Sequence, residues 1–341
     1  MKINIYDVAE KAGVSIATVS RVINNKGRVS EATKERVRNV IEELGYHPNM
    51  FAMGLAKQKT GIIGVLLPDF DNISLPDSYI MEFLNGLQLQ FTPYKYNILI
   101  INHPKNQAST DKPEYKNLIE GSKIDGLIVY EGMVSGDYLK SVAEKGFPVI
   151  LIGDENKVEE ISHIRLQERL ILESGLKYLK EMGHEKVSVF YYRDPILESS
   201  KVDFYKTAYE KAGLPFDEDA NLINGYYIED HIRDRIVEHM KKFDSTAYYT
   251  DCLSYATLVR DAGYILGRKV PEDLSLMSME HVVNESMELY PMLTTYLLNG
   301  LEVGKTSANI MIELLGENKG AKEVVINPVF NDFKSVRKIN N

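Results

Sequence analysis

Residues Ile5–Asn24 read IYDVAEKAGVSIATVSRVIN, and their order predicts the first two helices of the chain. Asn4 precedes this stretch and can cap a helix over Ile5–Ala12, which Gly13 ends because glycine enters tight turns without steric cost. Ser15 can cap a second helix that reaches the end of the stretch. Two short helices joined by a tight turn form the pattern of a helix-turn-helix.

A third helix is expected after a polar turn. Ser30 can cap it, and it runs to Leu44 before Gly45 stops it. Apolar residues at helical spacing would join the three helices in one small core. These residues are Val8, Ala12, Val14, Val19, Val22, Val37, Val40, Ile41 and Leu44. We therefore expect an all-α helix-turn-helix head over residues 1–47.

The second helix of the head presents Ile16, Ala17 and Arg21 on its outward face. In helix-turn-helix proteins this helix enters the major groove of DNA, where an arginine can read a guanine edge through two hydrogen bonds. Thr18 and Ser20 carry short hydroxyl groups that suit phosphate oxygens. A three-helix bundle without a nucleic-acid role would show the same spacing, so spacing alone leaves both interpretations open.

Charge is unevenly distributed along the chain. Residues 1–60 hold ten Lys and Arg against six Asp and Glu, a net charge of +4, whereas the 341-residue chain carries −9 and the remainder therefore −13. A basic head on an acidic body can bind phosphates locally. Because short segments often differ by a few charges, this asymmetry adds only a little to the argument.

The order of residues in the head resembles the N-terminal motif of the LacI/GalR family of bacterial transcription regulators. The resemblance rests on Asp7-Val8-Ala9, Ala12-Gly13-Val14-Ser15, Thr18-Val19-Ser20-Arg21-Val22, Asn24, Val29-Ser30 and Leu44-Gly45-Tyr46-His47-Pro48-Asn49. It implies base contacts from Ile16, Ala17 and Arg21. It also implies contacts with the DNA backbone from Tyr6, Thr18, Ser20, Asn24, Arg28 and Thr33.

Residues 48–60 resemble the hinge helix and linker of the same family. The resemblance implies minor-groove contacts from Asn49, Ala52 and Leu55. Leu55 would insert between base steps and kink the DNA, as apolar wedges do in other minor-groove proteins. Gly54 lowers helix propensity by about 1 kcal/mol relative to Ala. A hinge that becomes helical only on DNA is consistent with that glycine.

From Gly61 onward, apolar strand-like runs alternate with amphipathic helical stretches, which predicts parallel sheets covered by helices on both faces. The predicted strands are Ile62–Leu67, Asn97–Ile101, Ile124–Tyr130, Val149–Ile152, Val187–Tyr191, Ala247–Thr250 and Leu274–Met279. The remaining length, about 280 residues, exceeds one typical domain. We expect two doubly wound lobes over residues 61–335, the first at about 61–160 and 293–320 and the second at about 161–292 and 321–335.

The family resemblance continues more weakly over this body, and implies a fold of the periplasmic-binding-protein type with a small-molecule effector in the cleft between the lobes. Matched by position, the effector-binding residues are Asn72, Lys201, Thr250, Asp251 and Glu280. Several of them depart from the family pattern, in which Arg, Asn and Asp are usual at the positions of Lys201, Thr250 and Glu280. Carboxylate and amide groups suit sugar hydroxyls, and Lys201 suits an anionic group. The expected effector is therefore a sugar, a sugar phosphate or another anionic metabolite.

Some runs of the body look closest to the catabolite-control branch of the family, whose members can respond to a phosphorylated phosphocarrier protein. A regulator controlled mainly by such a partner, with a vestigial cleft, stays open because Gly153 and Leu298 also depart from the expected cleft residues. A sugar-binding protein or an enzyme is the weaker alternative. Gly300–Thr306 has three residues between its glycines where a P-loop needs four, and the seven His residues show no metal-binding spacing. We expect no cofactor, metal site or catalytic residue.

The location of the protein is predicted from its cysteine content and hydropathy. The single cysteine, Cys252, excludes a disulfide within the chain and suits a reducing cytoplasm. No apolar run is long enough for a membrane span, and acidic residues stand where a secretory signal would need an apolar stretch. The sequence therefore predicts a cytoplasmic, homodimeric repressor of carbohydrate metabolism that does not associate with membranes. Its two-fold symmetry would match a pseudo-palindromic operator in double-stranded DNA.

Overall fold

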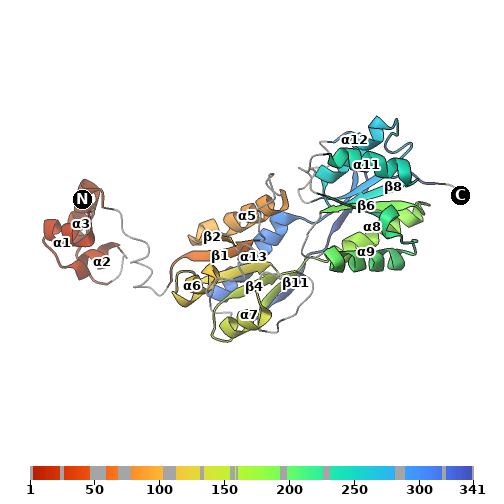
Figure 1. Cartoon of the computed structure of the whole chain (residues 1–341). Helices are drawn as coiled ribbons and strands as arrows, with labels where there is room; N and C mark the ends of the chain where they lie inside the picture. The colour runs from red at the N-terminus through yellow and green to blue at the C-terminus, as the bar shows by residue number, and fades with distance from the viewer. Residues whose placement is uncertain are drawn as a thin grey trace. The chain divides into compact units, whose positions relative to one another are not determined.

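The computed structural model describes residues 3–23, 27–46, 59–67, 78–102, 113–130, 134–153, 158, 160–192, 198–225, 231–280, 289–316 and 320–339. Figure 1 shows a helical head followed by a body of two α/β lobes. Asn24, the hinge residues Asn49, Ala52 and Leu55, and Asn72 lie outside the described ranges.

The head consists of the three predicted helices, α1 (Ile5–Ala12), α2 (Ile16–Ile23) and α3 (Glu31–Leu44). The Asn4 side chain caps α1 by accepting the N–H of Tyr6 at 2.8 Å. Gly13 ends α1 at φ 62°, in the left-handed region that favours glycine. The buried core of the head is Val8, Ala9, Ala12, Val19, Val22, Val37 and Val40. This confirms the all-α head.

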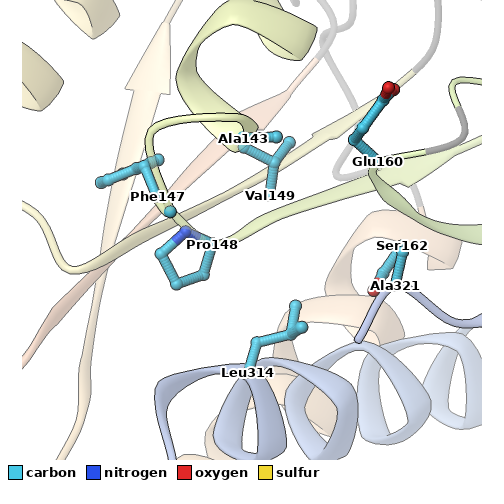
Figure 2. A pocket seen from close by; sticks show the side chains of 9 residues that line it. Ala143, Phe147, Pro148, Val149, Glu160, Ser162, Leu314 and Ala321 are labelled. Carbon is cyan, nitrogen blue, oxygen red and sulfur yellow. The ribbon is translucent and has the colours of Figure 1, made fainter. Parts of the chain in front are cut away.

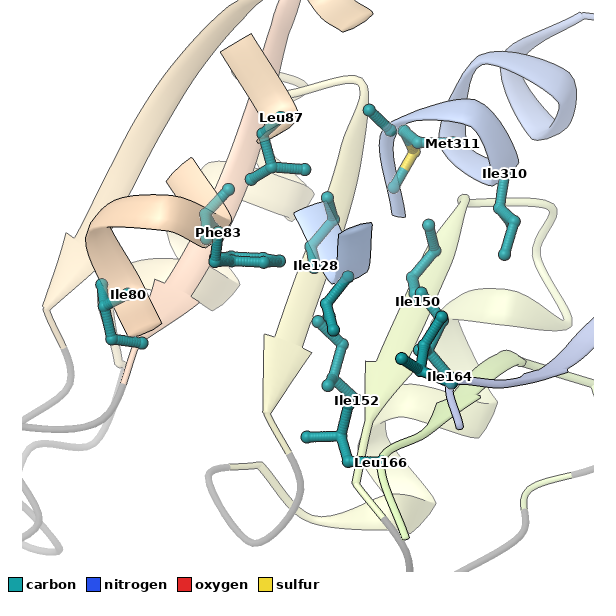
Figure 3. Close-up of a cluster of buried hydrophobic side chains, with 14 of the residues drawn as sticks. Ile80, Phe83, Leu87, Ile128, Ile150, Ile152, Ile164, Leu166, Ile310 and Met311 are labelled. Carbon is teal, nitrogen blue, oxygen red and sulfur yellow. The ribbon is translucent and has the colours of Figure 1, made fainter. Parts of the chain in front are cut away.

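The first lobe contains a six-stranded sheet in the order β11-β5-β4-β3-β1-β2. Its strands are β1 (Ile62–Leu67), β2 (Asn97–Asn102), β3 (Gly126–Tyr130), β4 (Val149–Ile152), β5 (Ser162–Arg165) and β11 (Glu323–Val325). Its helices are α5 (Ser78–Phe91), α6 (Glu114–Glu120), α7 (Gly136–Ala143) and α13 (Gly300–Leu315), with a 3₁₀ turn at Thr92–Tyr94. Ile side chains from β3, β4 and β5 meet α5 and α13 in the buried core (Figure 3).

The second lobe contains another six-stranded sheet, in the order β12-β10-β9-β8-β6-β7. Its strands are β6 (Val187–Tyr192), β7 (Leu222–Gly225), β8 (Ala247–Thr250), β9 (Ser275–Glu280), β10 (Thr294–Leu297) and β12 (Val329–Asn331). Its helices are α8 (Glu168–Glu181), α9 (Glu198–Ala212), α10 (Glu218–Asn221), α11 (Ile232–Lys242) and α12 (Leu253–Ile265). Adjacent strands from β7 to β10 run parallel, and the edge strand β12 pairs antiparallel with β10. The expectation of two largely parallel sheets is confirmed.

Three strands belong to a different lobe from the one that the expected lobe limits gave them. β5 and β11 belong to the first sheet, although the sequence placed residues after 160 and after 320 in the second lobe. β10 belongs to the second sheet, although the sequence placed it in the first lobe. These strands have only three or four residues, too few for a period-two pattern to reveal their partner strand.

The start of β1 is held by a carboxylate from a distant part of the chain. Asp125 accepts hydrogen bonds from the Thr60 N–H at 2.7 Å, the Thr60 hydroxyl at 2.9 Å and the Gly61 N–H at 2.7 Å. These three hydrogen bonds fix the backbone at Thr60 and Gly61, directly before β1 begins.

Among the helices that the structure describes, none has the length and apolar character of a membrane span.

Candidate nucleic-acid interface and effector site

Helix α2 divides its side chains between the core of the head and solvent. Val19 and Val22 are buried against α1 and α3, whereas Ala17 and Arg21 are exposed and Ile16 is 38% exposed. Each residue of a helix turns by about 100°, so Ile16, Ala17 and Arg21 fall within a sector of about 140° around the axis of α2. The structure therefore brings the three predicted base-contacting residues together on one outward surface.

Three of the predicted backbone contacts lie in the first turns of the three helices. Tyr6 lies in the first turn of α1 and is 67% exposed, Thr18 lies in the first turn of α2, and Thr33 lies in the first turn of α3. The Ser15 hydroxyl caps α2 by accepting the Thr18 N–H at 3.2 Å. Ser30 caps α3 in the same way through the Thr33 N–H, at 3.3 Å. Helix N-termini attract phosphate groups through free N–H groups and the helix dipole, so these positions suit contacts with the DNA backbone.

The basic residues of the head differ in whether acidic side chains already neutralise them. Lys11 pairs with Glu43 at 2.7 Å, and Lys34 pairs with Glu31 at 2.6 Å. In the described part of the chain, no carboxylate lies within ion-pair distance of Arg21 or Arg28, and both side chains are exposed. Their guanidinium groups can therefore pair with DNA without first breaking an ion pair with a described residue.

Three of the predicted effector residues lie at the carboxyl ends of neighbouring parallel strands in the second sheet. Thr250 ends β8, Asp251 follows it, and Glu280 ends β9. Glu280 is fully buried, and its Oε2 accepts the Thr295 hydroxyl at 2.8 Å. Thr250 is also buried, and donates its hydroxyl to the Cys252 carbonyl at 3.0 Å. Asp251 is partly exposed, so it is the predicted polar group of this edge best placed to meet a ligand.

Helix α9 supplies a side chain to the same edge. The Tyr205 hydroxyl donates to the Asp251 carboxylate at 3.2 Å. Burial raises the pKa of Tyr205 well above its usual 10, so the hydroxyl keeps its proton and remains a donor. Lys201 stands one helical turn earlier on α9, but its side chain lies outside the described atoms. Tyr205 was not predicted from the sequence. It could have been suggested by its spacing, because residues four positions apart, such as Lys201 and Tyr205, lie on the same face of a helix.

The head and much of the body each match a known protein family. Residues 4–49 match the model of the bacterial regulatory proteins of the lacI family, and residues 176–331 match the periplasmic binding protein-like domain. The chain belongs to the LacI family. It is a DNA-binding transcription regulator whose body has the fold of periplasmic binding proteins.

Individual LacI-family relatives match most of the chain or nearly all of it. Catabolite control protein A of Priestia megaterium is 28% identical over 99% of this chain and 100% of its own length. The HTH-type transcriptional regulator DegA of Bacillus subtilis is 28% identical over 86% of each chain. The crystal structure of the lac repressor dimer bound to operator and the anti-inducer ONPF has a TM-score of 0.75 at 18% identity, covering 98% of this chain and 100% of that one.

The body of this LacI-family protein also contains a small cavity of about 60 Å³. It lies near the amino ends of β4 and β5, and Figure 2 shows its lining side chains, among them Phe147, Glu160 and Leu314. Ligand pockets usually measure about 300–1,000 Å³. This cavity is too small for a sugar, and none of the predicted effector residues whose side chains the structure describes lines it.

Proposed function

We propose that this LacI-family regulator is a homodimeric repressor that acts in the cytoplasm and binds a pseudo-palindromic operator. The observation that carries the proposal is the outward face of α2, where Ile16, Ala17 and the exposed Arg21 stand together. Arg21 would read a guanine edge in the major groove, while the first turns of the three helices would bind phosphates. We assign DNA recognition, and no catalysis, to the chain.

Selection of binding sites from a randomised DNA library tests this assignment. The full-length chain should select a pseudo-palindrome, one half-site for each head. Arg21→Ala should cost about 1–3 kcal/mol at one base pair of each half-site and relax the preference there. Lys11→Ala is the matched control, because Lys11 carries the same charge but already pairs with Glu43. An Arg21→Ala variant that selects the wild-type site with unchanged base preference would show that Arg21 reads no base.

We further propose that the carboxyl edge of the second sheet binds a sugar, a sugar phosphate or another anionic metabolite. Support comes from Asp251, which is partly exposed and oriented by Tyr205, and from Lys201 one turn away along α9. Solved structures with this fold include a CelR–cellobiose complex, with a TM-score of 0.62 at 20% identity and coverage of 98% of this chain and 99% of that one. The family's usual Arg can bind a planar anionic group through two parallel hydrogen bonds. Lys201 carries a compact charge instead, which favours an anionic ligand that does not need such a paired contact.

Titration calorimetry with a panel of sugars and sugar phosphates tests the effector site. The proposal predicts that a sugar or sugar phosphate binds to the wild-type chain. Asp251→Ala should abolish this binding, and Asp261→Ala on α12 should leave it intact. Asp261 is a suitable control because it pairs with the neighbouring Arg260 and lies away from the carboxyl ends of the strands. Absence of binding across the panel, together with capture of serine-phosphorylated phosphocarrier, would instead support the partner-controlled alternative.

The proposed dimer is supported by an apolar surface on the first lobe. Met81 and Leu89 on α5 are more than half exposed. On β2, an edge strand of the sheet, Leu99 and Ile100 are exposed as consecutive residues. Exposed apolar edge strands favour pairing with another chain. A second copy of this chain is the partner that symmetric DNA recognition requires.

A further inference from the structure

The stem of Arg21 lies directly over Gly27, the first described residue between α2 and α3. A Cβ atom built on Gly27 would stand 3.4 Å from the Arg21 Cδ and 3.8 Å from its Cγ and Nε. Three consecutive atoms of the arginine therefore pass across the one face of Gly27 where any other residue would carry its side chain. A Cβ alone would make ordinary van der Waals contact with this stem, and side-chain atoms beyond Cβ that extend toward the stem would overlap it.

We propose that Gly27 is a specificity-determining position that acts through Arg21. Its missing side chain leaves the space in which the arginine stem crosses the loop. This inference rests on the proposed base contact of Arg21. Reading guanine through two hydrogen bonds needs the planar guanidinium in one orientation, and an exposed arginine has many other rotamers. A side chain at position 27 would displace the stem into one of those rotamers and weaken base discrimination, while the fold of the head remains intact.

The backbone conformation of Gly27 does not by itself distinguish it from other glycines of the head. Gly27 has a φ of 77°, and Gly13 and Gly45 have φ values of 62° and 58°. A Cβ on Gly13 or Gly45 would meet nothing within 4 Å. All three positions therefore share the strain of a left-handed backbone, but only Gly27 among them faces Arg21. Gly45 is thus a matched control for every substitution at Gly27.

The test compares Gly27→Asn and Gly27→Asp with Gly45→Asn and Gly45→Asp in the full-length chain. Asn and Asp tolerate positive φ better than other residues with a side chain. The readout is the ratio of affinities for the selected operator and for an operator changed at the base pair that Arg21 reads. Thermal unfolding of each pair reports any loss of stability separately.

We expect Gly27→Asn to lower the affinity ratio by about threefold and Gly27→Asp by about tenfold or more, because a carboxylate beside the Arg21 Nε would compete with the base for the guanidinium. Both Gly45 variants should keep the wild-type ratio, whatever their melting temperatures. In an Arg21→Ala background, adding Gly27→Asp should leave the ratio unchanged, because the side chain through which position 27 acts is gone.

Two contrary results are distinguishable. If Arg21→Ala lowers the ratio but Gly27→Asp leaves it at the wild-type value, position 27 does not act through Arg21 and the inference is overturned, while the base contact stands. If Arg21→Ala itself leaves the ratio unchanged, the proposed base contact fails and the inference fails with it.

Discussion

At the scale of single residues, burial separates polar side chains that maintain the fold from those that can meet a ligand. Glu280 was predicted as an effector residue, but its buried carboxylate holds Thr295 on the neighbouring strand β10. Asp251 is partly exposed, and Tyr205 fixes its orientation. We therefore expect Asp251 to discriminate between ligands, and Glu280 to act mainly by joining β9 to β10.

Two histidines with lowered pKa values, the buried His184 and the partly buried His239, make the stability of the second lobe depend on pH. The His184 Nε2 donates to the Arg337 carbonyl at 3.1 Å, and burial lowers the pKa of His184 to about 4. Burial likewise lowers the pKa of His239 to about 4. In the unfolded chain both histidines bind protons near pH 6.5, whereas in the folded chain they do not, so the free energy of unfolding should fall as the pH drops from about 7 to about 4. We expect these two residues to account for a loss of roughly 1–3 kcal/mol, measured by urea unfolding at a series of pH values.

Variants of single histidines isolate this contribution from that of the carboxylates. His184→Gln should reduce the pH dependence of unfolding between pH 4 and 7, even if it lowers stability at pH 7. His231→Gln is the control, because the His231 side chain is 83% exposed. If His184→Gln and the wild type lose stability equally across this window, buried His184 is not the source.

At the scale of elements, the contact between α5 and α13 depends on glycines where the two backbones meet. A Cβ on Gly304 would stand 2.1 Å from the Phe83 carbonyl oxygen, and a Cβ on Gly86 2.3 Å from the Leu301 carbonyl oxygen. Alanine normally stabilises a helix by up to about 1 kcal/mol relative to glycine. At Gly304 we expect the opposite, a loss of about 2–4 kcal/mol, because the backbones must separate to admit a methyl group.

Urea unfolding of Gly304→Ala checks this expectation. Asn309→Ala on the exposed face of the same helix is the matched control and should stay within about 0.5 kcal/mol of wild type. Equal stability of the two variants would mean that α5 and α13 can move apart at little cost.

The hinge is the element for which the prediction rests on sequence resemblance alone. Leu55→Ala should weaken operator binding and reduce DNA bending, because alanine is too short to separate base steps in the minor groove. A circular-permutation gel assay measures the bend angle. Circular dichroism of the chain with and without operator measures whether the hinge gains helix on DNA. A wild-type bend angle in Leu55→Ala would exclude the wedge.

At the scale of the whole molecule, dimerisation should control operator affinity. Ile100→Lys places a charge in the exposed apolar surface of β2, so we expect dimers to dissociate at concentrations at least about tenfold higher than for wild type. Sedimentation velocity measures this shift. Operator affinity should fall with it, because a monomer contacts only one half-site. Glu144→Lys after α7 changes an exposed charge elsewhere in the first lobe and should affect neither property. An Ile100→Lys chain that stays dimeric at the same concentrations would place the dimer interface elsewhere.

Local signals in the sequence are enough to predict the helices of the head and the longer strands of the body. The caps at Asn4, Ser15 and Ser30 and the helical spacing of the valines predict α1, α2 and α3 correctly, because capping and periodicity act within a few residues. Apolar runs such as Ile62–Leu67 predict the longer buried strands for the same reason.

Contacts between distant segments depend instead on tertiary packing. The short strands β5, β10 and β11 each join one of the two sheets, and no pattern of three or four residues can specify which sheet it is. The contact of Tyr205 with Asp251 and the passage of Arg21 over Gly27 likewise arise from how helices and loops are placed in space. Local preferences select helix or strand, but the burial of side chains from remote segments selects which residues become neighbours.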